Sequence, residues 1–205
     1  MDAEFWKERW REGRIGFHEG RPNDLLVAHA DRLGAKGRVL VPLCGKAQDL
    51  AFLASLGHEV VGVELAERAV KEFFQEHGLQ PNTRKRGALL EWAAGGIAIL
   101  HGDFFDVRPE DVGTITAFYD RAAIVALPAD LRPRYASHLR TLAGDAPGLT
   151  ITFEYPQDQM EGPPFSVSEE ELRRYFPSVQ CLEERKQESR SGVTLNERIF
   201  RIGAR

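Results

Sequence analysis

Two apolar runs of the sequence end in residues that suit a nucleoside ligand. The first run, residues 38–44, is followed by Gly45, and the second, residues 59–64, ends in Glu64, about 20 residues further on. Glycine at such a turn lets a ligand approach the backbone closely. A carboxylate in the second position accepts hydrogen bonds from both hydroxyls of a ribose. The pair therefore predicts a site for an adenosine-containing molecule.

The turn that contains Gly45 holds too few glycines for a dinucleotide. A dinucleotide site uses Gly-x-Gly-x-x-Gly to seat a pyrophosphate at a helix N-terminus, whereas the later positions here are Ala47 and Leu50. S-adenosylmethionine carries ribose and adenine but no phosphate, so an acid and an open turn suffice for it. The pattern favours S-adenosylmethionine over NAD. Two alternatives stay open: a purely structural turn with a solvated Glu64, and an NAD-dependent oxidoreductase.

The segment after a third apolar run, residues 97–101, offers contacts to an adenine ring. Asp103 is placed to accept a hydrogen bond from the adenine amino group, and Phe104 is placed to pack on the ring. The alternative is that Asp103 caps a turn and the phenylalanines belong to the core, which is the interpretation we favour for Phe105.

Arg121 follows a fourth apolar run, residues 114–119, whose end faces the same crevice. A guanidinium there is costly to desolvate unless it meets an anion. We expect that anion to be a carboxylate of the chain or an anionic substrate. The structural alternative is an ion pair with Asp120 or Glu154.

The elements that position these residues alternate between strand and helix. This order predicts parallel strands joined by right-handed crossovers, followed by an antiparallel pair around a Ser-Gly turn. The expected strands are residues 38–44, 59–64, 97–101, 114–119, 149–155, 179–188 and 194–202, and the expected helices are residues 2–13, 25–33, 47–56, 66–78, 131–142 and 169–176. We therefore predict an α/β, Rossmann-like fold of the class I S-adenosylmethionine-dependent methyltransferase type. Its seven-stranded, mostly parallel sheet has an antiparallel C-terminal strand and helices on both faces, and residues 79–96 form a polar excursion.

Composition and charge narrow the classes of partner. A formal net charge of −4 disfavours a nucleic-acid partner, because proteins that bind phosphates usually carry an excess of basic residues. We interpret the short basic run at residues 84–86 as a solvated loop. Two widely spaced cysteines, Cys44 and Cys181, form neither a disulfide framework nor a zinc-ligand pattern, so we expect no metal.

The chain shows no targeting or membrane signal. No apolar run approaches the roughly 20 residues that cross a bilayer, and the N-terminus is acidic where a signal peptide is basic. We expect a cytoplasmic monomer that acts on a small molecule, without a membrane or nucleic-acid partner. Residues 1–205 would form a single methyltransferase domain, with residues 1–34 as a helical lid over the cofactor site.

Several motifs together match one known family. The chain resembles bacterial thiopurine S-methyltransferase over almost its whole length, and the motifs that carry the resemblance are residues 5–10 with 16–18, 42–46, 57–64, 120–123 and 162–165. The resemblance implies methyl transfer from S-adenosyl-L-methionine to the sulfur of thiopurines and similar aromatic or heterocyclic thiols. S-adenosyl-L-homocysteine would be the product.

The resemblance also implies roles for individual residues. The N-terminal aromatic segment would close over the cofactor, Phe17 and Arg121 would bind the acceptor, and Arg121 would position it for the reaction. The implied cofactor contacts are Trp6, Trp10, Phe17, Leu43, Gly45, Glu64, Asp103, Phe104 and Arg121. Without the resemblance, Trp10 reads as part of a core-facing stripe. A second acceptor arginine of the family corresponds to Arg185 or Arg190.

Other reactions remain alternatives for the same cofactor. The acceptor could be a selenium or tellurium compound, an aliphatic thiol or a halide. A cofactor-binding protein without catalysis is a further alternative, against which Phe17 and Arg121 argue. An aromatic thiol is largely ionised near neutral pH and the leaving group is neutral, so no general base is expected. Most of the rate enhancement should come from holding donor and acceptor in line.

Overall fold

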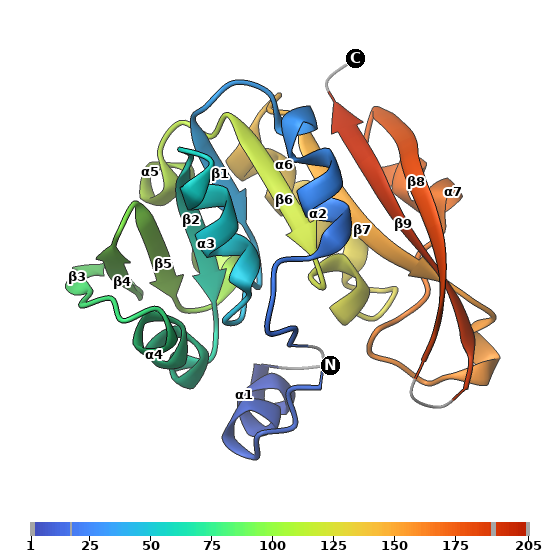
Figure 1. Cartoon of the computed structure of the whole chain (residues 1–205), viewed down its shortest axis with the longest axis horizontal. Coiled ribbons are helices and arrows are strands. Elements are labelled where there is room, and N and C mark those ends of the chain that lie inside the picture. Colours follow the sequence, from blue (N-terminus) through green and yellow to red (C-terminus); the bar gives the residue numbers. More distant parts are fainter. Residues whose placement is uncertain (1–2, 17, 190–191, 204–205) are drawn as a thin grey trace.

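A computed structural model describes residues 3–16, 18–189 and 192–203. Its described strands form one sheet in the order β3-β4-β5-β2-β1-β6-β7-β9-β8 (Figure 1). The strands are β1 (Arg38–Val41), β2 (Glu59–Glu64), β3 (Asn82–Arg86), β4 (Leu89–Ala94), β5 (Ile97–His101), β6 (Ala117–Arg121), β7 (Gly148–Glu154), β8 (Ser178–Glu188) and β9 (Thr194–Gly203). The α-helices are α1 (Ala3–Arg11), α2 (Asp24–His29), α3 (Gln48–Ser55), α4 (Glu67–Glu76), α5 (Pro109–Val112), α6 (Arg132–Ala143) and α7 (Glu169–Tyr175). Short 3-10 segments are η1 (Ala30–Leu33), η2 (Phe104–Asp106), η3 (Ile124–Ala126) and η4 (Gln157–Gln159).

The central strands run parallel, in the order β5-β2-β1-β6-β7. Strand β9 pairs antiparallel with β7, and β8 pairs antiparallel with β9. These strands and their directions confirm the predicted Rossmann-like sheet, but the described sheet has nine strands where seven were predicted. Continuous apolar runs become central parallel strands because helices cover both faces, so side chains that point to either face are buried.

Helices cover both faces of the sheet, as predicted. Helices α2, α3 and α4 pack on one face through a cluster that includes Leu26, Leu50 and Phe73. Helices α5, α6 and α7 pack on the opposite face through a second cluster, which includes Tyr135 and Leu172. All five side chains are fully buried, and each such burial stabilises the fold by about 1.5–3 kcal/mol.

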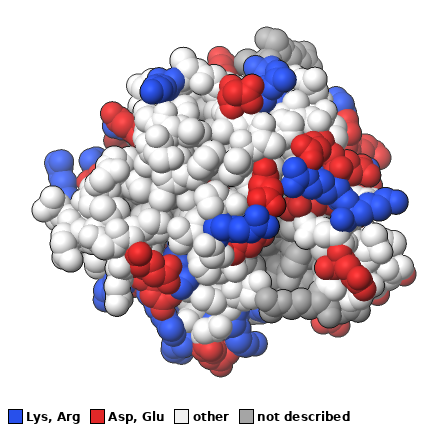
Figure 2. All heavy atoms as spheres, viewed as in Figure 1, with Lys and Arg blue, Asp and Glu red and all other residues white. Residues whose placement is uncertain are grey.

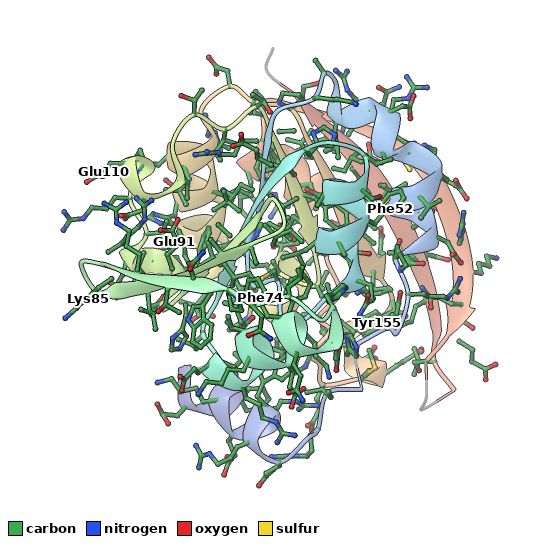
Figure 3. All side chains as sticks on the ribbon, turned by 60° about the vertical axis from the view of Figure 1, so that its left-hand side comes forward. Phe52, Phe74, Lys85, Glu91, Glu110 and Tyr155 are labelled. Carbon is green, nitrogen blue, oxygen red and sulfur yellow. The ribbon has the colours of Figure 1, made fainter. Side chains whose placement is uncertain are left out.

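The structure corrects the prediction that residues 79–96 form a polar excursion. Strands β3 and β4 form an antiparallel hairpin around Gly87, and β4 pairs with β5, which extends the sheet at this edge. The basic run at residues 84–86 therefore lies in a strand, and Figure 3 shows Lys85 at the outer end of the hairpin. The strand lacks an apolar pattern because it is an exposed edge strand, where charged side chains discourage pairing with another chain.

Helix α1 lies beyond the edge of the sheet at which the parallel strands end (Figure 1). The helix predicted over residues 2–13 is observed as α1, and its Trp10 packs with Ile15 against Ala66 and Ala69 at the start of α4. The aromatic stripe of α1 is thus directed at the same edge as the strand ends of β1, β2, β5 and β6.

The described residues show neither a membrane span nor a metal centre. No helix among them is long and apolar enough to cross a bilayer, and no group of three or more histidine, cysteine, aspartate or glutamate side chains could hold a metal ion. Figure 2 shows acidic and basic side chains close to one another on the face it presents.

Candidate cofactor and acceptor site

A cavity of about 770 Å³ opens at the carboxyl edge of the parallel strands, beside α1. Its lining includes the described members of the predicted cofactor set, Trp6, Trp10, Leu43, Gly45, Glu64, Asp103, Phe104 and Arg121. The remaining member, Phe17, lies outside the described residues, as does Arg190. The other candidate for a second acceptor arginine, Arg185, pairs with Glu183 at 2.6 Å. The fold therefore gathers residues from α1 and four strand ends around one space.

The turn after β1 depends on two left-handed backbone conformations. Leu43 and Gly45 have positive φ angles of 48° and 54°, which glycine adopts freely and leucine only under constraint. The Cys44 N–H donates to the Val63 carbonyl at 3.0 Å, which joins the turn to β2. An added Cβ at Gly45 would lie 3.1 Å from the Trp10 ring. The indole of α1 thus packs directly on the backbone of the turn.

Replacement of Gly45 by alanine is expected to lower both stability and affinity for an adenosyl ligand. The left-handed backbone would carry a Cβ at a cost of about 1–2 kcal/mol, and the new methyl group would displace Trp10. Gly87→Ala is a matched control, because Gly87 has a φ of 56° and nothing lies within 4 Å of an added Cβ. Thermal unfolding should detect a loss in both variants. Calorimetry should find S-adenosylhomocysteine bound about tenfold more weakly by Gly45→Ala alone, and equal affinities would contradict the Trp10 argument.

Glu64 ends β2 with only 6% of its surface exposed, so the alternative of a solvated carboxylate is wrong. Oε2 accepts a hydrogen bond from the Gly45 N–H at 2.8 Å, and Oε1 accepts one from the Ala66 N–H at 2.6 Å. Burial raises the pKa of Glu64, and the backbone donors oppose that rise. Carboxylate oxygens have about four lone-pair sites between them, so the fixed group keeps acceptor capacity for a ligand.

Asp103 and Phe104 lie where β5 ends. The Asp103 carboxylate accepts a hydrogen bond from the Phe105 N–H at 2.9 Å and so caps η2, which is the turn-capping alternative. That contact occupies Oδ1 and leaves Oδ2 available for an adenine amino group. The Phe104 ring is buried and lies 5.2 Å from the Tyr135 ring and 5.0 Å from that of His138. Both residues nevertheless line the cavity, so packing and ligand contact are compatible here.

The ion-pair partner of Arg121 is Glu19, and both partners considered from the sequence are wrong. Arg121 Nη2 lies 2.5 Å from Glu19 Oε1. Asp120 instead accepts a hydrogen bond from the Tyr135 hydroxyl at 2.8 Å, and Glu154 pairs with an arginine of β9. Side chains alternate along a strand, so Asp120 faces α6 while Arg121 faces the opposite side. Burial raises the pKa of Asp120 to about 6.

The cavity also contains charged residues to which the sequence analysis assigned no role. Lys46 Nζ lies 2.8 Å from a carboxylate oxygen of Glu72 and 2.6 Å from one of Glu76. Burial, and then the positive charge of Lys46, lower the pKa of His18. Lys46 and His18 belong to motifs that carry the family resemblance, and those motifs could have indicated that the two residues lie at the site. Glu19 had no such signal, because it lies in a segment without periodic pattern.

One wall of the cavity comes from the segment between β7 and α7. Pro163 and Pro164, from one of the resemblance motifs, line this wall together with Met160. The Tyr155 hydroxyl donates to the Pro164 carbonyl at 2.6 Å, and so holds the segment against the end of β7 (Tyr155 is labelled in Figure 3). This wall is mainly apolar, which suits a flat organic molecule.

Comparison with protein families and curated sequences gives one consistent result. The model of the family described as thiopurine S-methyltransferase (TPMT) matches residues 1–200. A thiopurine S-methyltransferase of Pseudomonas aeruginosa (strain UCBPP-PA14) is 47% identical, over 90% of this chain and 86% of that protein. Another, from Pseudomonas putida (strain F1), is 43% identical, over 98% of this chain and 99% of that protein.

Solved structures share the fold at low sequence identity. The 1,6-didemethyltoxoflavin-N1-methyltransferase of Burkholderia thailandensis, solved with S-adenosylhomocysteine, matches with a TM-score of 0.64 at 15% identity, over 98% of this chain and 87% of that one. The magnesium protoporphyrin IX methyltransferase of Synechocystis PCC 6803, also with S-adenosylhomocysteine, matches with a TM-score of 0.64 at 13% identity, over 100% of both chains. The fold is therefore that of S-adenosylmethionine-dependent methyltransferases.

Proposed function

The chain belongs to the thiopurine S-methyltransferase family, and on that premise we propose that it methylates the sulfur of a thiopurine or a similar aromatic or heterocyclic thiol. It is an S-adenosylmethionine-dependent methyltransferase with S-adenosylhomocysteine as product, so the NAD-dependent alternative is discarded. The observation that carries the proposed acceptor is that one cavity holds both the buried acid Glu64 and the cation Arg121.

The residues at the donor end of the cavity fit S-adenosylmethionine. The fixed carboxylate of Glu64 has acceptor capacity left for ribose hydroxyls, and Asp103 has one oxygen left for the adenine amino group. Gly45 carries no Cβ, so Trp10 packs directly on the backbone of the turn that lines the cavity. The indoles of Trp6 and Trp10 can attract a sulfonium through their ring faces. When bound, S-adenosylmethionine supplies an activated methyl group on that sulfonium.

At the acceptor end, we assign Arg121 to hold the acceptor as a thiolate. A nearby cation favours the ionised form of a thiol. The thiolate sulfur uses a lone pair to form the new S–C bond, while the electrons of the breaking C–S bond stay on the donor sulfur as a neutral thioether. No proton moves in this step, so the chain needs no general base. Its role is to hold donor and acceptor in near-attack geometry.

We also propose a role for the N-terminal residues in covering the cofactor. Residues 1–34 act as a helical lid over the cofactor site of a single domain spanning residues 1–205. Support comes from α1, whose Trp6 and Trp10 line the cavity. A cytoplasmic location is also part of the proposal, and the free thiols of Cys44 and Cys181 support it, because reduced cysteines are typical of that compartment.

An acceptor panel with labelled S-adenosylmethionine tests this function. The panel compares 6-mercaptopurine and thiophenol with an aliphatic thiol, a selenol, a tellurium compound and iodide. We expect the two aromatic thiols to give the highest kcat/KM, because their flat rings fit the apolar wall of the cavity, which would hold the sulfur in place for transfer. A higher kcat/KM for the aliphatic thiol, the selenium or tellurium compound or iodide would overturn the proposed acceptor class.

A further inference from the structure

The cation assigned to the acceptor already has an anion beside it. Arg121 ends β6 with 13% of its side chain exposed, and Glu19, from the segment between α1 and α2, contacts its Nη2 at 2.5 Å. Both side chains line the cavity. A thiolate that approaches Arg121 therefore meets the chain's own carboxylate at the same guanidinium.

Further carboxylates face this guanidinium from other elements. Asp49 on α3 is almost fully buried and accepts hydrogen bonds from the Asn23 N–H at 2.7 Å and the Tyr119 hydroxyl at 3.0 Å. Glu197 on β9 is also buried, and burial raises the pKa of both acids while the charge of Arg121 lowers it. An anionic acceptor added beside Glu19 would place another negative charge close to these acids, which is unfavourable at low dielectric.

The Arg121–Glu19 ion pair has fewer contacts than a second arginine–glutamate pair of the same chain, so Glu19 can give way to another anion. Arg132 is held by the Leu127 carbonyl, the Ser166 carbonyl and both carboxylate oxygens of Glu171, with 4% of its side chain exposed. Glu19 touches Arg121 through one oxygen, and 42% of the Glu19 side chain is exposed. Glu19 can therefore turn into solvent while Arg121 stays in the cavity.

We propose that Glu19 is a specificity-determining residue, whose carboxylate competes with anionic acceptors for Arg121. An acceptor that binds as an anion must displace Glu19, whereas a neutral acceptor leaves the pair intact. The residue thus weakens the binding of anionic aromatic acceptors relative to neutral ones of the same shape. This inference rests on the proposed function, because it takes Arg121 as the acceptor-binding cation.

Binding of benzoate and benzamide tests the competition without methyl transfer. The two molecules have similar shapes, but only benzoate is an anion. Calorimetry on the full chain, saturated with S-adenosylhomocysteine, should show Glu19→Gln binding benzoate about tenfold more tightly than the parent protein does. Benzamide affinity should change less than about twofold. Asp24→Asn is the matched control, because it removes one exposed charge, paired with Arg21, from the same part of the chain, and it should change neither affinity.

Dependence on Arg121 separates competition from a general change of charge or shape. In an Arg121→Gln background, Glu19→Gln should leave benzoate affinity unchanged. In turnover with an aromatic thiolate, Glu19→Gln should lower KM by a similar factor and leave kcat unchanged. Glu19→Ala serves as a second variant, and the thermal midpoint with S-adenosylhomocysteine confirms that each variant is folded.

Three results would overturn the proposal. The first is that folded Glu19→Gln and Glu19→Ala bind benzoate as the parent protein does. The second is that Glu19→Gln binds benzamide more tightly by the same factor as benzoate. The third is that Glu19→Gln still increases benzoate affinity in the Arg121→Gln background. These outcomes are independent of the methylation panel. A chain that methylates no thiol but shows the benzoate effect refutes the proposed function alone, and a chain that methylates aromatic thiols without the effect refutes only the competition.

Discussion

Replacing Glu64 with alanine is expected to weaken binding of S-adenosylhomocysteine by at least about 100-fold. A hydrogen bond to a charged group contributes about 1.5–3 kcal/mol, and the carboxylate is proposed to accept one from each ribose hydroxyl. The loss of two such bonds corresponds to about 3 kcal/mol or more, which is over two orders of magnitude in the dissociation constant. Calorimetric titration of the purified variant measures this effect directly.

The same substitution is expected to lower stability, because Glu64 also organises two turns. Its oxygens accept from the N–H groups of Gly45 and Ala66, and an alanine would leave both donors without these partners. Each unsatisfied buried donor costs about 1–3 kcal/mol. Thermal unfolding without ligand therefore separates the structural loss from the binding loss. Glu64→Gln keeps the side-chain volume but presents one amide nitrogen to a backbone donor, so we expect intermediate losses of both.

A matched control for Glu64 lies at the start of α4. Glu67 is an exposed glutamate that pairs with Lys71 at 2.8 Å and is not among the residues that line the cavity. Glu67→Ala removes the same charge and should leave the dissociation constant of S-adenosylhomocysteine unchanged. A folded Glu64→Ala variant that binds the ligand as tightly as Glu67→Ala does would refute the ribose role.

The parallel part of the fold was predictable because its determinants are local. Runs such as residues 59–64 have a continuous apolar centre, here residues 60–63, and turn residues near both ends, so they indicate strands buried on both faces. Parallel topology then brings the ends of such strands to one edge. Glu64, Asp103 and Arg121 follow different runs, and the structure accordingly brings them to one cavity.

The features that the sequence analysis missed depend on contacts that carry no local pattern. Strand β3 is polar because it forms the exposed edge of the hairpin, so periodicity could not distinguish it from a loop. Adjacency in sequence suggested Asp120 for Arg121, but alternation along β6 turns the two side chains apart. The true partner, Glu19, is brought close by an irregular segment whose path only the tertiary structure defines.

Removal of the Arg121 side chain is expected to affect the acceptor far more than the donor. For Arg121→Ala, kcat/KM with an aromatic thiolate should fall about 100-fold, which corresponds to the loss of one charge-assisted contact to the reacting anion. The affinity for S-adenosylhomocysteine should fall by no more than about fivefold, because Glu64 and Asp103 provide the proposed adenosyl contacts. Steady-state kinetics with an aromatic thiol and calorimetry with S-adenosylhomocysteine give the two quantities.

Substitution of a second, similarly buried arginine is a control for the structural effect of losing a cation. Arg198 on β9 bridges Glu154 and Glu184, each at 2.5 Å, with 21% of its side chain exposed, and it is not among the residues that line the cavity. Arg198→Ala should lower stability by an amount similar to that for Arg121→Ala but leave kcat/KM almost unchanged. If both variants reduce kcat/KM equally, the effect of Arg121 is structural.

The size of the loss caused by Arg121→Ala also depends on the charge of the acceptor. With the guanidinium removed, Glu19 remains at the cavity without its counter-ion, so its carboxylate repels a thiolate rather than merely failing to attract it. A neutral acceptor of the same shape experiences neither effect. Arg121→Ala should therefore weaken the binding of benzoate to the complex with S-adenosylhomocysteine much more than the binding of benzamide, because only benzoate is an anion. Equal losses for the two molecules would contradict a charge-based role for Arg121.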